Sequence, residues 1–273
     1  MKILRKLHIR FILIAFAATL ILTSCSKKRE ENLRIAVSNS YLESAAKEFL
    51  GSDEKILRLT EPGMCPGHFD VQPSHILKLS KCQLLLKFDF QKLLDERIFK
   101  DSTNKVIVSI KLNGGLCCPE TYLEACKQTA FALEEQGLIS PKAREEKLKE
   151  IGERLKKLSQ KSHEIAGTSG LNGIPIIASA HQAEFCKWLG FDVVGKFSAA
   201  DVASFQEIEK AIDAGKIKNV KFVIANKPEG RRLADALAER LGAKVIVFDN
   251  FPDVNVSLPF DNMLQKNITA LNN

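Results

Sequence analysis

Short apolar runs rich in β-branched residues alternate with amphipathic segments along most of the chain, and this alternation restricts the fold more than any other feature. Four such runs occur in the first half and four in the second, separated by segments with apolar residues at helical spacing. Strands that alternate with helices predict βαβ units and parallel sheets. We therefore expect an α/β fold with two lobes, each containing a four-stranded, mainly parallel sheet flanked by helices. The expected strands are 33–38, 55–60, 82–88, 106–110, 174–179, 192–197, 220–225 and 243–248.

A long charged segment from Pro141 to about Ala166 separates the two sets of strands. Leu148, Ile151 and Leu155 belong to a narrow apolar seam at three- to four-residue spacing, which predicts one long helix. We expect this helix to be a stiff backbone between lobes that rock slightly, although a coiled-coil partner is the alternative. The predicted division is a signal peptide at 1–24, a tether at 25–32, an N-terminal lobe at 33–139, the backbone helix at 140–167 and a C-terminal lobe at 168–273.

The N-terminus has the pattern of a secretory signal. Basic residues precede an apolar run from Phe11 to Leu22, which is too short to span a bilayer comfortably. The following Leu22-Thr23-Ser24-Cys25 resembles the lipobox of bacterial lipoproteins, in which the cysteine carries the lipid. We predict an exported protein, anchored to the membrane through Cys25 on the periplasmic or extracellular face. An ordinary signal peptide with a chance cysteine, or an uncleaved anchor, is the alternative.

The charge of the chain argues against nucleic acid as a partner. The whole chain has a net charge of +7, but residues 1–24 hold four basic and no acidic residues. The remainder therefore has 36 basic against 33 acidic residues, a net charge of +3. This balance gives no electrostatic reason for binding nucleic acid. Six cysteines besides Cys25 are unusual in an exported chain unless they form disulfides or bind metal.

Polar residues follow several predicted strands at the positions where ligands bind in doubly wound sheets, namely the carboxyl ends. Potential donors follow the second, fourth, fifth and eighth strands, and we expect these strand ends to face a common cleft. In that order, the potential donors are Cys65 and His68, Cys117 and Cys118, His181, and Asp249.

Three of these segments make the chain similar to the metal-binding receptors of ABC importers, the zinc and manganese group known as periplasmic solute-binding protein family 9. Residues 62–86, with His68, look like the first ligand loop of that family. Residues 177–191, with His181, look like the loop with a second ligand histidine, and 242–249 resembles the strand that ends in a ligand aspartate. The resemblance implies a monomeric receptor, not an enzyme, that captures a transition-metal ion and delivers it to an ABC permease.

The chain departs from the family at one ligand, because no histidine precedes Pro119-Glu120. We therefore predict a metal site of His68, His181 and Asp249, completed by one of Cys117, Cys118 or Cys65. Two imidazoles, a thiolate and a carboxylate suit zinc. Manganese, copper or another divalent metal remains open, because extra thiolates favour softer ions and oxygens favour manganese. A disulfide between Cys117 and Cys118, or between either and Cys65, is the alternative to ligation.

Other functions are compatible with parts of the sequence. A thiol-dependent exported enzyme could use Cys117 or Cys118 with His181. A receptor of the same type could take a metal chelate, haem or a siderophore, but two tyrosines and one tryptophan make a stacking-rich cleft unexpected. A lipoprotein that has lost metal binding is a further alternative.

Overall fold

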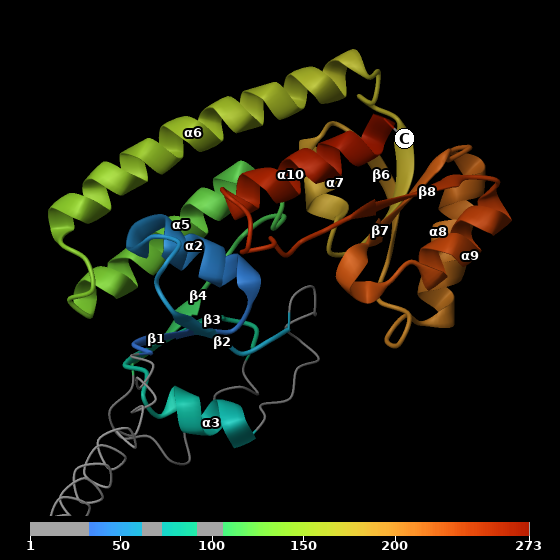
Figure 1. The fold of residues 1–273 in the computed structure, drawn as a ribbon. Coiled ribbons are helices and arrows are strands. Elements are labelled where there is room, and N and C mark those ends of the chain that lie inside the picture. Colours follow the sequence, from blue (N-terminus) through green and yellow to red (C-terminus); the bar gives the residue numbers. More distant parts are fainter. Residues whose placement is uncertain (1–32, 62–72, 92–105, 273) are drawn as a thin grey trace, which may run out of the picture. The chain divides into compact units, whose positions relative to one another are not determined.

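The computed structural model describes residues 33–61, 73–91 and 106–272. Two four-stranded sheets, with all neighbouring strands parallel, form the framework (Figure 1). Their strand orders, β2-β1-β3-β4 and β6-β5-β7-β8, follow the same pattern. The predicted α/β class is thus confirmed. The strands are β1 (Ile35–Val37), β2 (Ile56–Arg58), β3 (Leu84–Phe88), β4 (Val106–Ile110), β5 (Pro175–Ser179), β6 (Asp192–Phe197), β7 (Phe222–Asn226) and β8 (Lys244–Phe248).

Helices lie between the other consecutive strands, as parallel pairing favours, while residues 92–105 between β3 and β4 are outside the described ranges. Side chains cap several of them at the N-terminus, where the first backbone N–H groups have no partner within the helix. Asn39, Ser140 and Ser204 accept hydrogen bonds in this way. The helices are α2 (Ser40–Leu50), α3 (Pro73–Leu79), α5 (Pro119–Glu135), α6 (Pro141–Thr168), α7 (Ala183–Trp188), α8 (Phe205–Ile217), α9 (Arg232–Leu241) and α10 (Pro259–Thr269), with 3-10 turns η3 (Lys227–Glu229) and η4 (Ala270–Asn272). None of the helices in the described ranges is long and apolar enough to cross a bilayer.

The long helix α6 confirms the predicted element between the two sheets and ends two residues later than expected, at Thr168. Its seam residues Ile151, Leu155 and Leu158 are buried, and the helix packs along α5 and α10 (Figure 1). Near its C-terminal end, His163 Nε2 lies 2.8 Å from the carbonyl oxygen of Trp188, at the end of α7. The helix α6 therefore contacts α5, which follows the first sheet, and α7, which flanks the second.

The two lobes share one continuous apolar core. Val37 and Leu86, in the first sheet, belong to the same buried cluster as Ile176 and Phe248, in the second. A shared core opposes wide separation of the lobes, because opening would expose apolar surface to water. This arrangement agrees with the expectation of slight rocking about a stiff connector.

The last helix, α10, returns to the helices of the first sheet. The ring of Phe260 stacks on that of Tyr122, with a centroid distance of 4.0 Å, and lies 6.2 Å from the ring of Tyr41. The predicted C-terminal lobe at 168–273 thus includes a helix that packs on the first lobe. The domain boundaries themselves remain predictions.

Candidate metal centre

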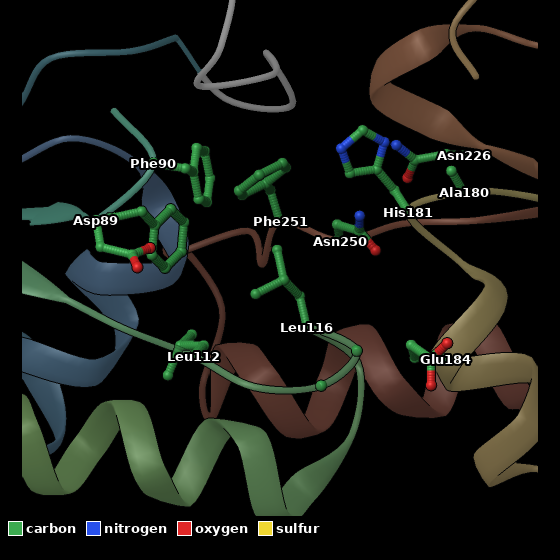
Figure 2. Close-up of a pocket in the computed structure, with 13 residues that line it drawn as sticks. Asp89, Phe90, Leu112, Leu116, Ala180, His181, Glu184, Asn226, Asn250 and Phe251 are labelled. Carbon is green, nitrogen blue, oxygen red and sulfur yellow. The ribbon is translucent and has the colours of Figure 1, made fainter. Parts of the chain in front are cut away.

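A cavity of about 430 Å³ lies at the carboxyl ends of strands from both sheets (Figure 2). The end of β3, the loop after β4 and the ends of β5, β7 and β8 contribute to its walls. The sequence-based expectation that strand ends from both lobes meet at one cleft holds for these elements. The lining residues are Phe88, Asp89, Phe90, Leu112, Gly114, Gly115, Leu116, Ala180, His181, Glu184, Asn226, Asn250 and Phe251.

His181 is the predicted donor that reaches this cavity. It follows β5 directly, and its side chain is 54% exposed. Its Nδ1 is hydrogen-bonded to Oε1 of Glu229, whose other carboxylate oxygen accepts a hydrogen bond of 2.7 Å from the Ser179 hydroxyl. Nδ1 is the ring nitrogen with a hydrogen-bond partner among the described residues, so Nε2 is available to a ligand. Metal-bound histidines are commonly oriented by a carboxylate in this way.

The hydrogen bond between His181 and Glu229 favours the charged form of each side chain. The hydrogen bond to Glu229 raises the pKa of His181 above its usual range, although partial burial opposes this shift. Burial alone would raise the pKa of Glu229, but the hydrogen bonds from His181 and Ser179 outweigh it and lower that pKa. Glu229 therefore accepts the hydrogen bond from Nδ1–H of His181, which leaves Nε2 as the ring nitrogen that can bind a metal ion once it has lost its proton.

Cys117 lies in a buried polar network away from the cavity. Its sulfur is 3.0 Å from the backbone oxygen of Asp249 and 3.4 Å from Oδ1 of Asn250, and the Asn267 amide donates to it at 3.4 Å. Burial raises the pKa of Cys117 well above its usual value. In this network the side chain is a thiol that donates a hydrogen bond to the Asp249 carbonyl oxygen.

Cys118 is buried too and precedes α5 as its N-terminal cap residue. Burial raises its pKa to about 12. Both cysteines are free thiols, so the alternative of a disulfide between them is not realised in this structure. Neither lines the cavity that contains His181.

Asp249 follows β8 as expected, but its carboxylate is already engaged. Lys227 Nζ lies 2.7 Å from Oδ2, and the Phe251 backbone N–H donates to Oδ1 at 3.1 Å. Asp249 and Lys227 line a second cavity, of about 390 Å³, which does not include His181. Within the described ranges, no three His, Cys, Asp or Glu side chains come close enough together to hold a metal ion.

Three predicted sites lie outside the described residues. Cys65 and His68 fall in the range 62–72, and the lipidation site Cys25 falls in 1–32. The metal set that the sequence predicts is therefore only partly visible. The described part of this set consists of His181 at the cavity, Asp249 in an ion pair with Lys227, and the two buried cysteines Cys117 and Cys118.

Sequence reasoning missed the residues that support His181. Asn226 is the last residue of β7, and Glu229 and Asn250 follow β7 and β8. Gln182 Nε2 donates to both asparagines, at 3.0 and 2.6 Å. The strand-end rule would have found Asn226 and Glu229 if it had been applied to the seventh strand. The expectation of a cleft poor in aromatic rings is wrong for this cavity, because Phe88, Phe90 and Phe251 line it.

Two helix-linked α/β lobes with a cavity at their strand ends define a class of substrate-binding proteins. The chain belongs to the family described as "Zinc-uptake complex component A periplasmic", whose sequence model matches residues 119–273. This is a family of metal-uptake components and not of enzymes. No curated protein matches the chain at the level of its sequence.

Solved structures of metal-binding proteins share the fold. A zinc-bound ZnuA deletion mutant is 16% identical, with 88% of this chain and 96% of that chain covered and a TM-score of 0.69. A manganese-bound periplasmic metal-binding protein from Candidatus Liberibacter asiaticus is 12% identical, with coverage of 88% and 98% and a TM-score of 0.71. The laminin-binding protein Lmb of Streptococcus agalactiae is 15% identical, with coverage of 88% and 99% and a TM-score of 0.69. At these identities the likeness concerns the fold.

Proposed function

We propose that this protein is an extracytoplasmic substrate-binding lipoprotein that captures a transition-metal ion, with zinc as the favoured metal, and delivers it to an ABC permease. The observation that carries the proposal is the orientation of His181 by a buried carboxylate at the mouth of a cavity. Family membership supports metal uptake as the role. Zinc is favoured by the imidazole donor and by the zinc-bound protein of the same fold.

The proposed ligand set differs from the one predicted from the sequence in its cysteines and in the role of Asp249. We retain His181 and, from the segment outside the described residues, His68 or Cys65. Asp249 can join them only after it leaves Lys227. Cys117 and Cys118 are not included, because both are buried and neither lines the cavity that contains His181. The same argument weakens the alternative of a thiol-dependent enzyme, which needs an accessible thiolate.

The cellular setting is proposed from the N-terminal sequence. Cleavage before Cys25 and lipidation of its thiol would anchor a monomeric receptor on the outer side of the cytoplasmic membrane or in the periplasm. Manganese and copper are the competing metals, and a manganese-bound protein of the same fold supports the first of these.

The test is zinc binding by calorimetry on protein freed of metal, with His181→Ala as the variant. We expect its affinity to fall by more than about a hundredfold, since losing a ligand costs more than losing the residue that orients it. His163→Ala is the matched control, because His163 is bonded to the Trp188 carbonyl outside the cavity. Equal zinc affinity in wild type and His181→Ala would contradict the proposal, as would the absence of binding to any of zinc, manganese and copper.

A further inference from the structure

The buried side chain of Asn267 holds the backbone of Asp249 on both sides. Its Oδ1 accepts a hydrogen bond of 2.9 Å from the Asp249 backbone N–H, and its Nδ2 donates to the Asp249 carbonyl oxygen, also at 2.9 Å. Asn267 lies in α10 and is 3% exposed. Because one planar amide makes both bonds, the chain cannot shift or turn at Asp249 without breaking at least one of them.

A second buried donor reaches the same carbonyl from the first lobe. Cys117, in the loop after β4, donates to the Asp249 carbonyl oxygen at 3.0 Å, and its sulfur accepts from Asn267 Nδ2 at 3.4 Å. The helix α10 itself packs on α2 and α6, and its Phe260 stacks on Tyr122 of α5. Asp249 is thus joined to the first lobe through its backbone, although it follows a strand of the second sheet.

The residues that follow the two candidate ligands His181 and Asp249 are hydrogen-bonded to each other. Gln182 Nε2 donates to Oδ1 of Asn250 at 2.6 Å, and both side chains are buried. Phe251 lines the cavity that contains His181 as well as the one that contains Asp249. The ends of β5 and β8 are therefore held next to each other, and a small shift of the Asp249 backbone would change the separation of the two donor groups.

We propose that Asn267 is a positioning residue of the metal site, which aims the Asp249 carboxylate at the ion by fixing the Asp249 backbone. This inference rests on the proposed function and adds to it a residue that acts through a ligand. An aspartate has a single carbon between its backbone and its carboxylate, so the place of the carboxylate follows that of the backbone. Metal ligands need such support, because a binding geometry tolerates errors of only about 0.5 Å.

A double-mutant cycle tests the inference, with zinc affinity measured by calorimetry on the metal-free protein. Asn267→Ala and Asp249→Asn should each lower the affinity by about tenfold, as expected for loss of support or of charge at one ligand. In the Asp249→Asn background, Asn267→Ala should change the affinity by less than about twofold, because the carboxylate that it positions is gone. Asn267→Leu removes the same two bonds with less loss of volume, and it should give the same results.

Ile268→Ala is the control for a general loss of stability. Ile268 is the next residue of α10, is buried in the shared apolar core, and has no polar group that could hold Asp249. The substitution should lower the melting temperature by about 5 °C or more, at least as much as Asn267→Ala does. Zinc affinity should nevertheless stay close to that of the wild type.

The contrary outcomes separate this inference from the function on which it rests. An equal loss from Asn267→Ala in both backgrounds, or a tenfold loss from Ile268→Ala, would show that Asn267 acts only through the stability of the fold, and would overturn the inference. Wild-type affinity in Asp249→Asn would overturn it as well, while the proposed function would stand on His181. If His181→Ala binds zinc as the wild type does, the proposed function fails, and the inference fails with it.

Discussion

His181 and Cys117 both follow a strand at its carboxyl end, and the sequence assigns both to a metal site. The structure gives them different surroundings. His181 lines an open cavity and has a buried carboxylate behind it, whereas Cys117 is almost fully buried and surrounded by backbone and amide groups. The comparison shows that a strand end determines where a side chain lies but not whether its donor atom can reach a ligand.

The chemical state of each group follows from these surroundings. Glu229 keeps a proton on Nδ1 of His181, so Nε2 is the nitrogen that can lose its proton and bind a metal ion. Burial keeps the proton on Cys117, and the resulting S–H donates within the network. We therefore propose that His181 is a ligand and Cys117 a structural residue, and the predictions below test that distinction.

Among substitutions that leave His181 itself in place, the largest effect is expected from Glu229→Gln. The amide keeps the shape of the side chain but no longer orients His181 with a negative charge, so zinc affinity should fall by about 10- to 100-fold. Calorimetry on the metal-free protein measures this. Glu207→Gln is the control, because the Glu207 carboxylate also accepts a serine hydrogen bond, from Ser198 at 2.8 Å, but lies outside the cavity. An equal loss in both variants would show that Glu229 has no special relation to His181.

Cys117→Ala should act on stability and leave zinc binding intact. It removes the hydrogen-bond donor to the Asp249 carbonyl and should lower the free energy of unfolding by about 1–2 kcal/mol. Urea unfolding measures the loss, and Cys117→Ser, which keeps a donor, should recover part of it. Should both variants instead lose zinc affinity by tenfold or more, Cys117 would be a ligand and the contrast with His181 would disappear.

Lys227→Met tests whether Asp249 is a metal ligand, like His181, or a structural residue, like Cys117. The substitution removes the ammonium group that lies 2.7 Å from the Asp249 carboxylate. Since Lys227 is well exposed, we expect a modest gain in zinc affinity, about two- to fivefold, as the freed carboxylate meets the ion. Asp249→Asn should change the affinity in the opposite direction. No change in either variant would place Asp249 among the structural residues.

The smallest effect is a pH dependence of stability in the metal-free protein. The pKa of His181 is raised in the folded protein. The stability that its ion pair adds is therefore fully present below the reference pKa of 6.5 and is lost as pH rises through the folded pKa. The pKa of Glu229 is lowered, so its contribution is present above the reference value of 4.5 and is lost as pH falls through its folded value. The destabilisation by Glu229→Gln should therefore be greatest between pH 4.5 and 6.5.

Its size is limited by solvent, because the His181 side chain is more than half exposed. We expect about 0.5 kcal/mol for this screened pair. Thermal or urea unfolding at several pH values measures it. A difference between wild type and Glu229→Gln that is constant from pH 4 to 8 would show that the two groups do not form an ion pair.

The fold was largely predictable, because hydrophobic periodicity is a local signal. The seam of α6 and the paired sets of strands can be recognised within short windows of sequence. The position of His181 was predictable for the same reason, since it follows a strand. Its partner Glu229 lies 48 residues away and belongs to a turn after β7, a strand end that the sequence analysis did not consider.

The state of the cysteines was not predictable, because it depends on distant packing. The Asn267 amide that donates to Cys117 lies 150 residues further along the chain. No local pattern indicates that such a group will cover the thiol. The aromatic lining of the cavity was missed for a simpler reason, since only tyrosine and tryptophan were considered as stacking residues, whereas phenylalanine is far more abundant here, with 16 residues.

The position of α10 has a consequence for the order of folding. Phe260 covers Tyr41 in α2 and Tyr122 in α5, so those rings stay uncovered while the ribosome has not yet made residues 259–269. Limited proteolysis of a chain that ends at 258 should therefore cut near α2 and α5. The first lobe therefore completes the packing around these two rings only after residues 259–269 have been made.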